Sequence, residues 1–204
     1  MDIINGPVRR RLLEAASELF SRKGYSGTTV REIVAAAGVT KPALYYYFKK
    51  KEGIYIELLG ETFAKLDRLL DATGSYQGSA EEKLRHLCDQ TFSLFLENTK
   101  VARVMYSIYY GPQQGSPFFD FDSYHVKLIQ SIRRIIEEGI EQKELYPGNS
   151  EHMSWVILGA IIIAMDLQLT HPEWGLDKVG LSGMLDLIFR GIAGERKAGE
   201  GERI

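Results

Sequence analysis

The amino-acid sequence predicts an all-α protein in which a small basic domain with a helix-turn-helix precedes a larger, acidic helical domain. Apolar residues recur at three- and four-residue spacing along most of the 204 residues, whereas alternation with a period of two is scarce. Residues 1–51 contain 10 lysines and arginines against 4 acidic residues, and residues 52–204 contain 15 against 23. We therefore expect domains at 1–51 and 52–204, of which only the first is attracted to a polyanion.

The positions of the helix breakers predict about nine helices. Runs rich in glycine, proline and serine at 72–79, 111–117 and 146–150 separate longer segments with helical periodicity. The expected helices span 8–23, 29–37, 41–47, 52–72, 80–97, 100–110, 119–144, 150–170 and 177–193. Residues 194–204 are expected to form a polar, frayed tail.

The first two helices of the basic domain have clear start and stop signals. Leu12 and the apolar residues that follow it at helical spacing form one face of the first helix, which should end at Gly24. Thr29 and Glu32 have the spacing of a capping box, in which each side chain bonds to the backbone N–H of the other residue. The second helix should therefore start at Thr29 and end before Gly38.

The third helix can be oriented from its spacing alone. Thr40 can cap its start, and Pro42 stands in the first turn, where no N–H is missed. Leu44 and Phe48, four residues apart, are the natural pair of anchors in the core. At 100° per residue, Pro42 and Tyr46 then point directly away from the core.

An outward face of small and aromatic residues is unusual for a solvated helix, but it suits the major groove of DNA. Small residues allow close approach to base edges, and tyrosine hydroxyls and lysines can bond to phosphates. The alternative is that Tyr45, Tyr46 and Tyr47 only pack against the core. Lys41 at one end and lysines 49–51 at the other favour DNA binding.

The segment Thr28-Thr-Val-Arg-Glu-Ile-Val-Ala-Ala-Ala-Gly-Val-Thr-Lys-Pro-Ala-Leu-Tyr-Tyr-Tyr-Phe-Lys-Lys-Lys-Glu52 resembles the TetR family of bacterial transcriptional regulators. The resemblance extends back through residues 15–20 and Gly24-Tyr25, so it covers about the first quarter of the chain. It implies an all-α homodimer with an N-terminal DNA-binding domain. It also implies a divergent C-terminal domain that binds a small effector and usually relieves repression of a palindromic operator.

The resemblance assigns DNA contacts to the residues that match the family's motif. The resemblance implies a phosphate contact for Thr29, a base contact for Arg31, and base reading at the start of the third helix by Lys41, Pro42 and Ala43. It implies phosphate contacts for Tyr45, Tyr47 and Lys51. With Thr40 and Tyr46, the complete predicted set is Thr29, Arg31, Thr40, Lys41, Pro42, Ala43, Tyr45, Tyr46, Tyr47 and Lys51.

The last two predicted helices are apolar enough to bury a further surface. Residues 154–169 are apolar nearly all round, and glycines in both helices permit close backbone approach. An intramolecular core explains this pattern, and the resemblance adds a four-helix dimer interface; both can hold at once. The candidate interface residues are Trp155, Gly159, Ile162, Leu181, Leu185, Ile188 and Ile192.

Aromatic residues gather in the middle of the chain. Such residues are often core, but tyrosine hydroxyls on an apolar lining are also typical of a ligand pocket. We therefore expect an apolar or aromatic effector, with Phe92, Phe95, Tyr106, Tyr109, Tyr110 and Asp166 as candidate contacts. The alternative is a DNA-binding regulator whose second domain is controlled by a protein partner, or is not controlled by any ligand or partner.

The sequence contains few features that would indicate an enzyme. Its four histidines are scattered, no phosphate-binding glycine loop is present, and a single cysteine, Cys88, can form neither an internal disulfide nor a cysteine metal cluster. Asp120, Asp122 and His125 are the one arrangement that could hold a metal, although Asp122 as a helix cap explains them better. We expect no cofactor, no membrane segment and a cytoplasmic location, with metal-dependent catalysis as the remote alternative.

Overall fold

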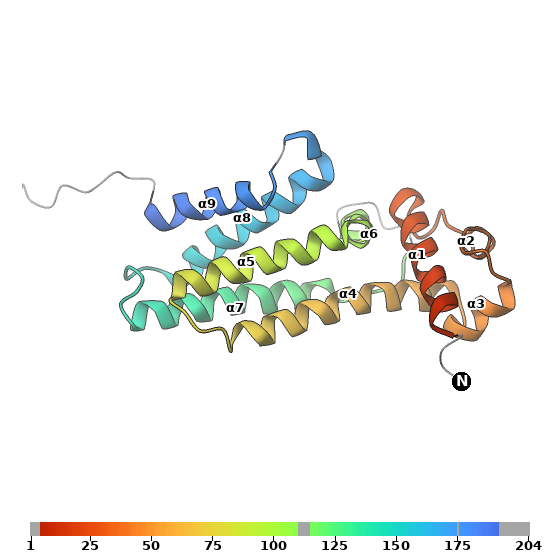
Figure 1. Ribbon diagram of the computed structural model, residues 1–204, viewed down its shortest axis with the longest axis horizontal. Helices are drawn as coiled ribbons and strands as arrows, with labels where there is room; N and C mark the ends of the chain where they lie inside the picture. Colours follow the sequence, from red (N-terminus) through yellow and green to blue (C-terminus); the bar gives the residue numbers. More distant parts are fainter. Residues whose placement is uncertain (1–4, 110–114, 175, 192–204) are drawn as a thin grey trace, which may run out of the picture. The chain divides into compact units, whose positions relative to one another are not determined.

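The computed structural model describes residues 5–109, 115–174 and 176–191, and in these ranges it contains nine α-helices, one short 3-10 helix and no strand (Figure 1). The all-α prediction is therefore confirmed, and every helix starts and ends within three residues of its expected position. The helices are α1 Asn5–Lys23, α2 Val30–Ala37, α3 Lys41–Phe48, α4 Lys51–Thr73, α5 Ala80–Glu97, α6 Thr99–Tyr109, α7 Phe121–Glu141, α8 Ser150–Thr170 and α9 Lys178–Arg190, with the 3-10 helix at Pro172–Trp174.

The chain forms two compact units. The first unit comprises Met1–Gly74 and Ser93–Leu128, and the second comprises Ser75–Phe92 and Ile129–Ile204. Helices α4 and α6 thus share a compact unit with the three N-terminal helices, and α5 and α7 contribute to both units. The functional division expected at residue 51 stays a prediction.

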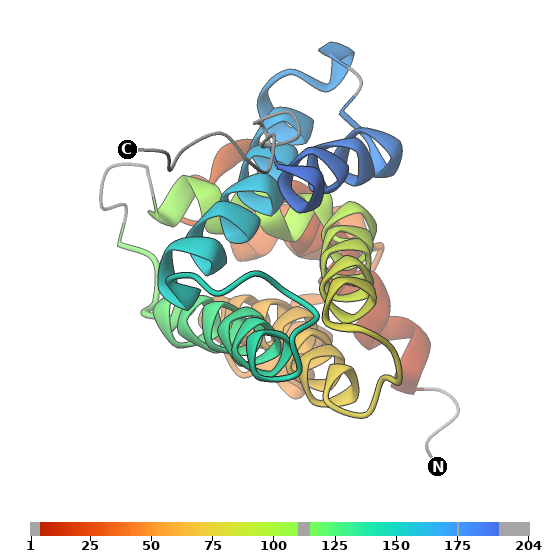
Figure 2. The ribbon, with the colours of Figure 1, turned by 90° about the vertical axis from the view of Figure 1, so that its left-hand side faces the viewer.

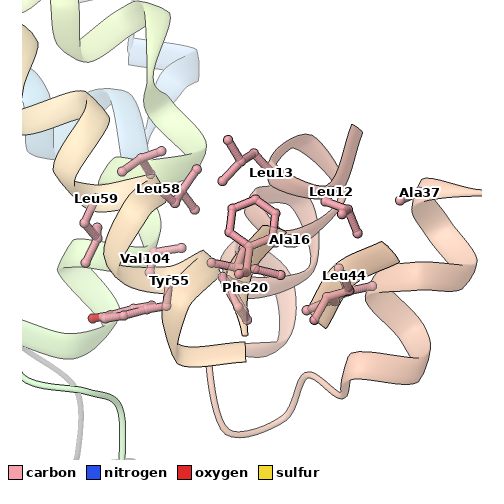
Figure 3. Close-up of a cluster of buried hydrophobic side chains, with 14 of the residues drawn as sticks. Leu12, Leu13, Ala16, Phe20, Ala37, Leu44, Tyr55, Leu58, Leu59 and Val104 are labelled. Atoms are coloured by element: carbon pink, nitrogen blue, oxygen red, sulfur yellow. The ribbon is translucent and has the colours of Figure 1, made fainter. Parts of the chain in front are cut away.

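The first unit has one apolar core, to which five helices contribute (Figure 3). Leu12 and Phe20 enter it from α1, Leu44 from α3, Tyr55 from α4 and Val104 from α6, each with at most 1% of its surface exposed. Burial of side chains of this size contributes about 1.5–3 kcal/mol each. This shared core holds the short helices α2 and α3, which would be too short to persist alone.

Two glycines make the turns around α2 possible. Gly24, directly after α1, has φ 73°, and Gly38, directly after α2, has φ 63°. This left-handed conformation carries a steric cost for residues with a Cβ, which glycine avoids. The N–H of Gly38 bonds back to the carbonyls of α2 and closes its last turn. Both helix ends predicted from these glycines are confirmed.

In the second unit, α8 and α9 lie side by side (Figures 1 and 2). Two ion pairs join α9 to α5: Arg85 reaches Asp186 at 2.8 Å, and Lys178 reaches Asp89 at 3.1 Å. Arg85 also covers the ring of Phe189, 5.0 Å from its centre. These contacts lie where α9 meets α5.

Candidate nucleic-acid interface

The second helix begins at a complete capping box. The Thr29 hydroxyl accepts from the backbone N–H of Glu32 at 3.2 Å, and the Glu32 carboxylate accepts from the Thr29 N–H at 2.9 Å. Lys23 bonds to the other carboxylate oxygen. The Lys23 ammonium, followed by the Thr29 N–H and hydroxyl, lowers the pKa of Glu32 to about 2. The predicted capping box is therefore confirmed, and it fixes where α2 starts.

The third helix has the predicted orientation. Leu44 and Phe48 are buried in the core, with 0% and 4% of their surfaces exposed. Pro42 is exposed, as are Tyr46 at 73% and Tyr45 at 48%. Helix α3 therefore has an exposed, uncharged face with two tyrosine hydroxyls. Tyr45 and Tyr46 do not only pack against the core, so that alternative fails for them.

The other residues predicted to contact DNA differ in exposure. Thr29, Arg31, Thr40 and Lys41 are exposed, while Ala43, Tyr47 and Lys51 are half-buried. Tyr47 packs against the core and meets the ring of Tyr46 edge-on, with 5.0 Å between the ring centres. Thr40 stands at the N-cap position of α3, but its side chain makes no capping hydrogen bond, so the predicted cap was wrong. Pro42 in the first turn removes one backbone donor that would need a cap.

Three positive charges near α2 and α3 are uncompensated. Arg31, Lys41 and Lys49 are exposed and form no ion pair with any residue that the structure describes. Lys50, by contrast, pairs with Glu52 at the start of α4. Charges without an internal partner can neutralise phosphates without first breaking a contact.

The ammonium of Lys51 is engaged inside the protein. It donates to the backbone carbonyls of Tyr25 and Thr28, both at 2.8 Å, and lies 4.0 Å from the centre of the Tyr25 ring. Partial burial lowers its pKa. No pattern in the sequence indicates this arrangement, because the partners are backbone atoms more than twenty residues away.

Only part of the predicted dimer surface is exposed. Trp155 and Gly159 are exposed, and Ile162 and Ile188 are half-buried. Leu181 and Leu185, with 2% and 3% exposed, lie in the core of their own unit, as the intramolecular explanation predicts, and their role in an interface stays a prediction. Ile192 lies outside the described residues.

Helix α9 has a second apolar stripe that sequence analysis missed. Val179, Gly183 and Leu187 are spaced by four residues, and the two larger side chains are 78% and 64% exposed. On α8, Val156 and Ile163 extend the exposed side that holds Trp155. We call these residues together the α8/α9 apolar face: Trp155, Val156, Gly159, Ile163, Val179, Gly183 and Leu187.

The predicted effector contacts are distributed over both compact units. Phe95, Tyr106 and Tyr109 belong to the first unit, and Phe92 and Asp166 belong to the second. Both phenylalanines are buried, Tyr106 and Asp166 are half-buried, and Tyr109 is exposed, with its hydroxyl donating to Asp122 at 3.2 Å. Tyr110 lies outside the described residues. The effector site stays a prediction.

The region of Asp120, Asp122 and His125 caps a helix, as expected, but through a different residue. Asp120, not Asp122, accepts from the backbone N–H of Ser123 at 3.1 Å; Asp120 directly precedes α7, and Ser123 lies in its first turn. In the described parts of the chain, no three histidine, cysteine, aspartate or glutamate side chains are grouped as metal ligands.

Helix α8 is, by length and composition alone, long and apolar enough to cross a membrane, contrary to expectation. The same composition occurs in core helices of water-soluble proteins, and 39% of its most apolar window is buried. One side of α8 is covered within its unit, and the other belongs to the α8/α9 apolar face.

Comparison with known proteins finds similarity to bacterial transcriptional regulators. The family described as "Bacterial regulatory proteins, tetR family" matches residues 12–58. The Fatty acid metabolism regulator protein of Bacillus subtilis is 31% identical over 91% of this chain and 96% of its own length. The HTH-type transcriptional repressor AcnR of Corynebacterium glutamicum is 32% identical over 88% and 89%.

Solved structures share the whole fold. The TetR family regulator PfmR of Thermus thermophilus has a TM-score of 0.70 at 24% identity, covering 92% of this chain and 98% of its own. The regulator FadR of Bacillus subtilis, in complex with stearoyl-CoA, has a TM-score of 0.67 at 22% identity, covering 90% and 99%.

Proposed function

Because the chain belongs to the TetR family of bacterial transcriptional regulators, we propose that it is a repressor that binds a palindromic operator as a homodimer and is released by a small effector. It is a transcriptional regulator and not an enzyme. The single observation that carries the proposal is the outward face of α3, where Pro42 and Tyr46 stand exposed between uncompensated lysines. We place the protein in the cytoplasm, where such an operator is found.

The proposed contacts follow from exposure and charge. Arg31 and the start of α3, at Lys41 to Ala43, read base edges in the major groove, where an arginine can bond to guanine and small residues can approach thymine methyls. Thr29, Tyr45 and Tyr47 bond to phosphates, and Tyr46, which points away from the core, contacts base edges in the groove. The uncompensated charge of Lys49 adds a sequence-independent attraction.

The α8/α9 apolar face supports the homodimer. Trp155, Val156, Ile163, Val179 and Leu187 are exposed in the single chain. A second copy that covered them by the same face would form an isologous contact. Gly159 and Gly183 would let the two backbones approach, because no atom lies within 4 Å of a Cβ added at either. Two-fold symmetry then presents two copies of α3 to successive major grooves, about 34 Å apart or somewhat more.

Selection from a pool of random DNA duplexes tests the operator proposal. We expect the bound fragments to share two inverted half-sites, spaced by about one helical turn. The Tyr46→Ala variant, changed only on the exposed face, should fail to enrich the same sequence. Enrichment of a single half-site, or of no sequence, would overturn the palindrome.

For the effector we propose a long-chain fatty acyl-CoA. The support is the similarity over nearly the whole chain to the Fatty acid metabolism regulator protein, and the bound stearoyl-CoA of FadR. The mid-chain aromatic residues are suited to an acyl chain. The alternative, control by a protein partner, predicts no response to any acyl-CoA.

Thermal unfolding with and without stearoyl-CoA tests this effector class. At a hundredfold excess over Kd, binding adds about 2.7 kcal/mol, which raises the Tm of a chain this size by roughly 5–10 °C. Coenzyme A alone and stearate alone serve as controls. The ligand should also release the selected operator duplex. An unchanged Tm and an intact complex would overturn the acyl-CoA proposal without touching the DNA-binding one.

A further inference from the structure

The first turn of α4 holds the turn between α1 and α2. Lys51 reaches back from the start of α4 and donates to the carbonyls of Tyr25 and Thr28, each at 2.8 Å. One helical turn later, Tyr55 is fully buried and meets the ring of Tyr25, with 5.0 Å between the ring centres. Two side chains on the same side of α4 therefore hold residues 25–28.

This turn directly precedes the start of α2. Thr28 is buried, and its hydroxyl donates to the carbonyl of Gly24 at 2.9 Å. The next residue, Thr29, is the N-cap of α2, and Arg31 lies in the first helical turn. Because the chain from Thr28 to Thr29 is continuous, holding Thr28 also sets where the exposed N-terminus of α2 lies relative to α4.

The ammonium of Lys51 has few donors left for DNA. An ammonium group has three N–H donors, and two of them are used by carbonyls at short distance. The Tyr25 ring lies 4.0 Å from the charge and adds a cation–π attraction. One donor of Lys51 remains for a phosphate, and the two carbonyl bonds restrict where it can point. The exposed Lys49, two residues earlier, pairs with no described residue and keeps all three donors.

We infer that Lys51 is a positioning residue, which anchors the α1–α2 turn to α4 and so orients the N-terminus of α2, and that it does not act as a phosphate contact. This departs from the role that the family resemblance implies for this position. The inference about DNA rests on the proposed function; the anchoring itself does not. A shift of α4 would pass through this contact to α2.

The matched pair Lys51→Met and Lys49→Met separates the two roles. Each variant removes one positive charge within the same three-residue run and keeps a chain of similar length. Hydrogen exchange of the full-length protein without DNA reads out the anchor. In Lys51→Met, the amides of residues 25–32 should exchange about tenfold faster, since charge-assisted hydrogen bonds are lost. In Lys49→Met, exchange of these amides should not change.

Binding to a random-sequence duplex at several salt concentrations measures whether the charge of each lysine neutralises a phosphate. Each phosphate contact contributes about 0.9 to the slope of log Kobs against log salt. Lys49→Met should lower the slope by about this amount. Lys51→Met should leave the slope unchanged, although its affinity for the selected operator falls about tenfold because α2 is less well held.

Two results would overturn the inference. One is unchanged exchange at residues 25–32 in Lys51→Met, which would mean that the contact positions nothing. The other is a fall of about 0.9 in the salt slope of Lys51→Met, which would mean that Lys51 does contact a phosphate. If the wild-type protein binds no duplex at all, the proposed function fails, and the exchange measurement still decides whether Lys51 anchors the turn.

Discussion

Leu187→Asp should dissociate the proposed dimer. Leu187 belongs to the α8/α9 apolar face and is 64% exposed. Full burial of a leucine is worth about 1.5–3 kcal/mol, so covering this exposed part contributes roughly 1–2 kcal/mol. Two-fold symmetry doubles the loss to about 2–4 kcal/mol per dimer, a factor of roughly 30 to 1,000 in Kd. Desolvation of two unpaired carboxylates increases the loss further.

Sedimentation velocity across a concentration series measures this change. The wild type should sediment as a dimer at micromolar concentration, and Leu187→Asp as a monomer with an unchanged far-UV circular dichroism spectrum. Tyr146→Asp is the matched control, because Tyr146 is 90% exposed but lies outside α8 and α9. A Leu187→Asp protein that stays dimeric, or a wild type that is strictly monomeric, would refute the argument that this face binds a second copy.

Three further predictions concern the DNA-binding helices. Tyr46→Ala should keep the wild-type Tm, since the side chain is 73% exposed, but lose about 1–3 kcal/mol on the selected operator in a gel-shift titration. Arg31→Ala should lose a similar amount on the operator and much less on random DNA; equal losses would contradict base reading. The pKa of Glu32 is lowered from its ordinary value of 4.5 to about 2, so the ionised carboxylate stabilises the fold. The Tm of the wild type should therefore fall as the pH is lowered from 4.5 to about 2. The Tm of Glu32→Gln should fall less over the same range.

The helix-turn-helix was predictable because its signals are local. The capping box of Thr29 and Glu32 and the stop at Gly38 each involve residues within one or two turns, so spacing alone identifies them. The orientation of α3 followed from Leu44 and Phe48 for the same reason. Thr40 was the exception, because whether a side chain bonds to the helix end depends on its rotamer as well as its position.

Features that depend on distant partners were not predictable. Helix α9 has two apolar stripes, one through Leu181 and Leu185 and one through Val179 and Leu187, and periodicity cannot say which of them the core covers. The core covers the stripe of Leu181 and Leu185, through packing with residues far apart in the chain. The contacts of Lys51 with backbone carbonyls leave no trace in the pattern of side chains.

The two surfaces of this protein depend on each other energetically. Helix α3 has eight residues and is about 12 Å long, so it spans about three to four base pairs. Each good base contact adds about 1–3 kcal/mol to the preference for the operator, and a dimer makes twice as many of these contacts as one copy does. Loss of the α8/α9 apolar face should therefore reduce discrimination between operator and random DNA, although no residue that touches DNA has changed.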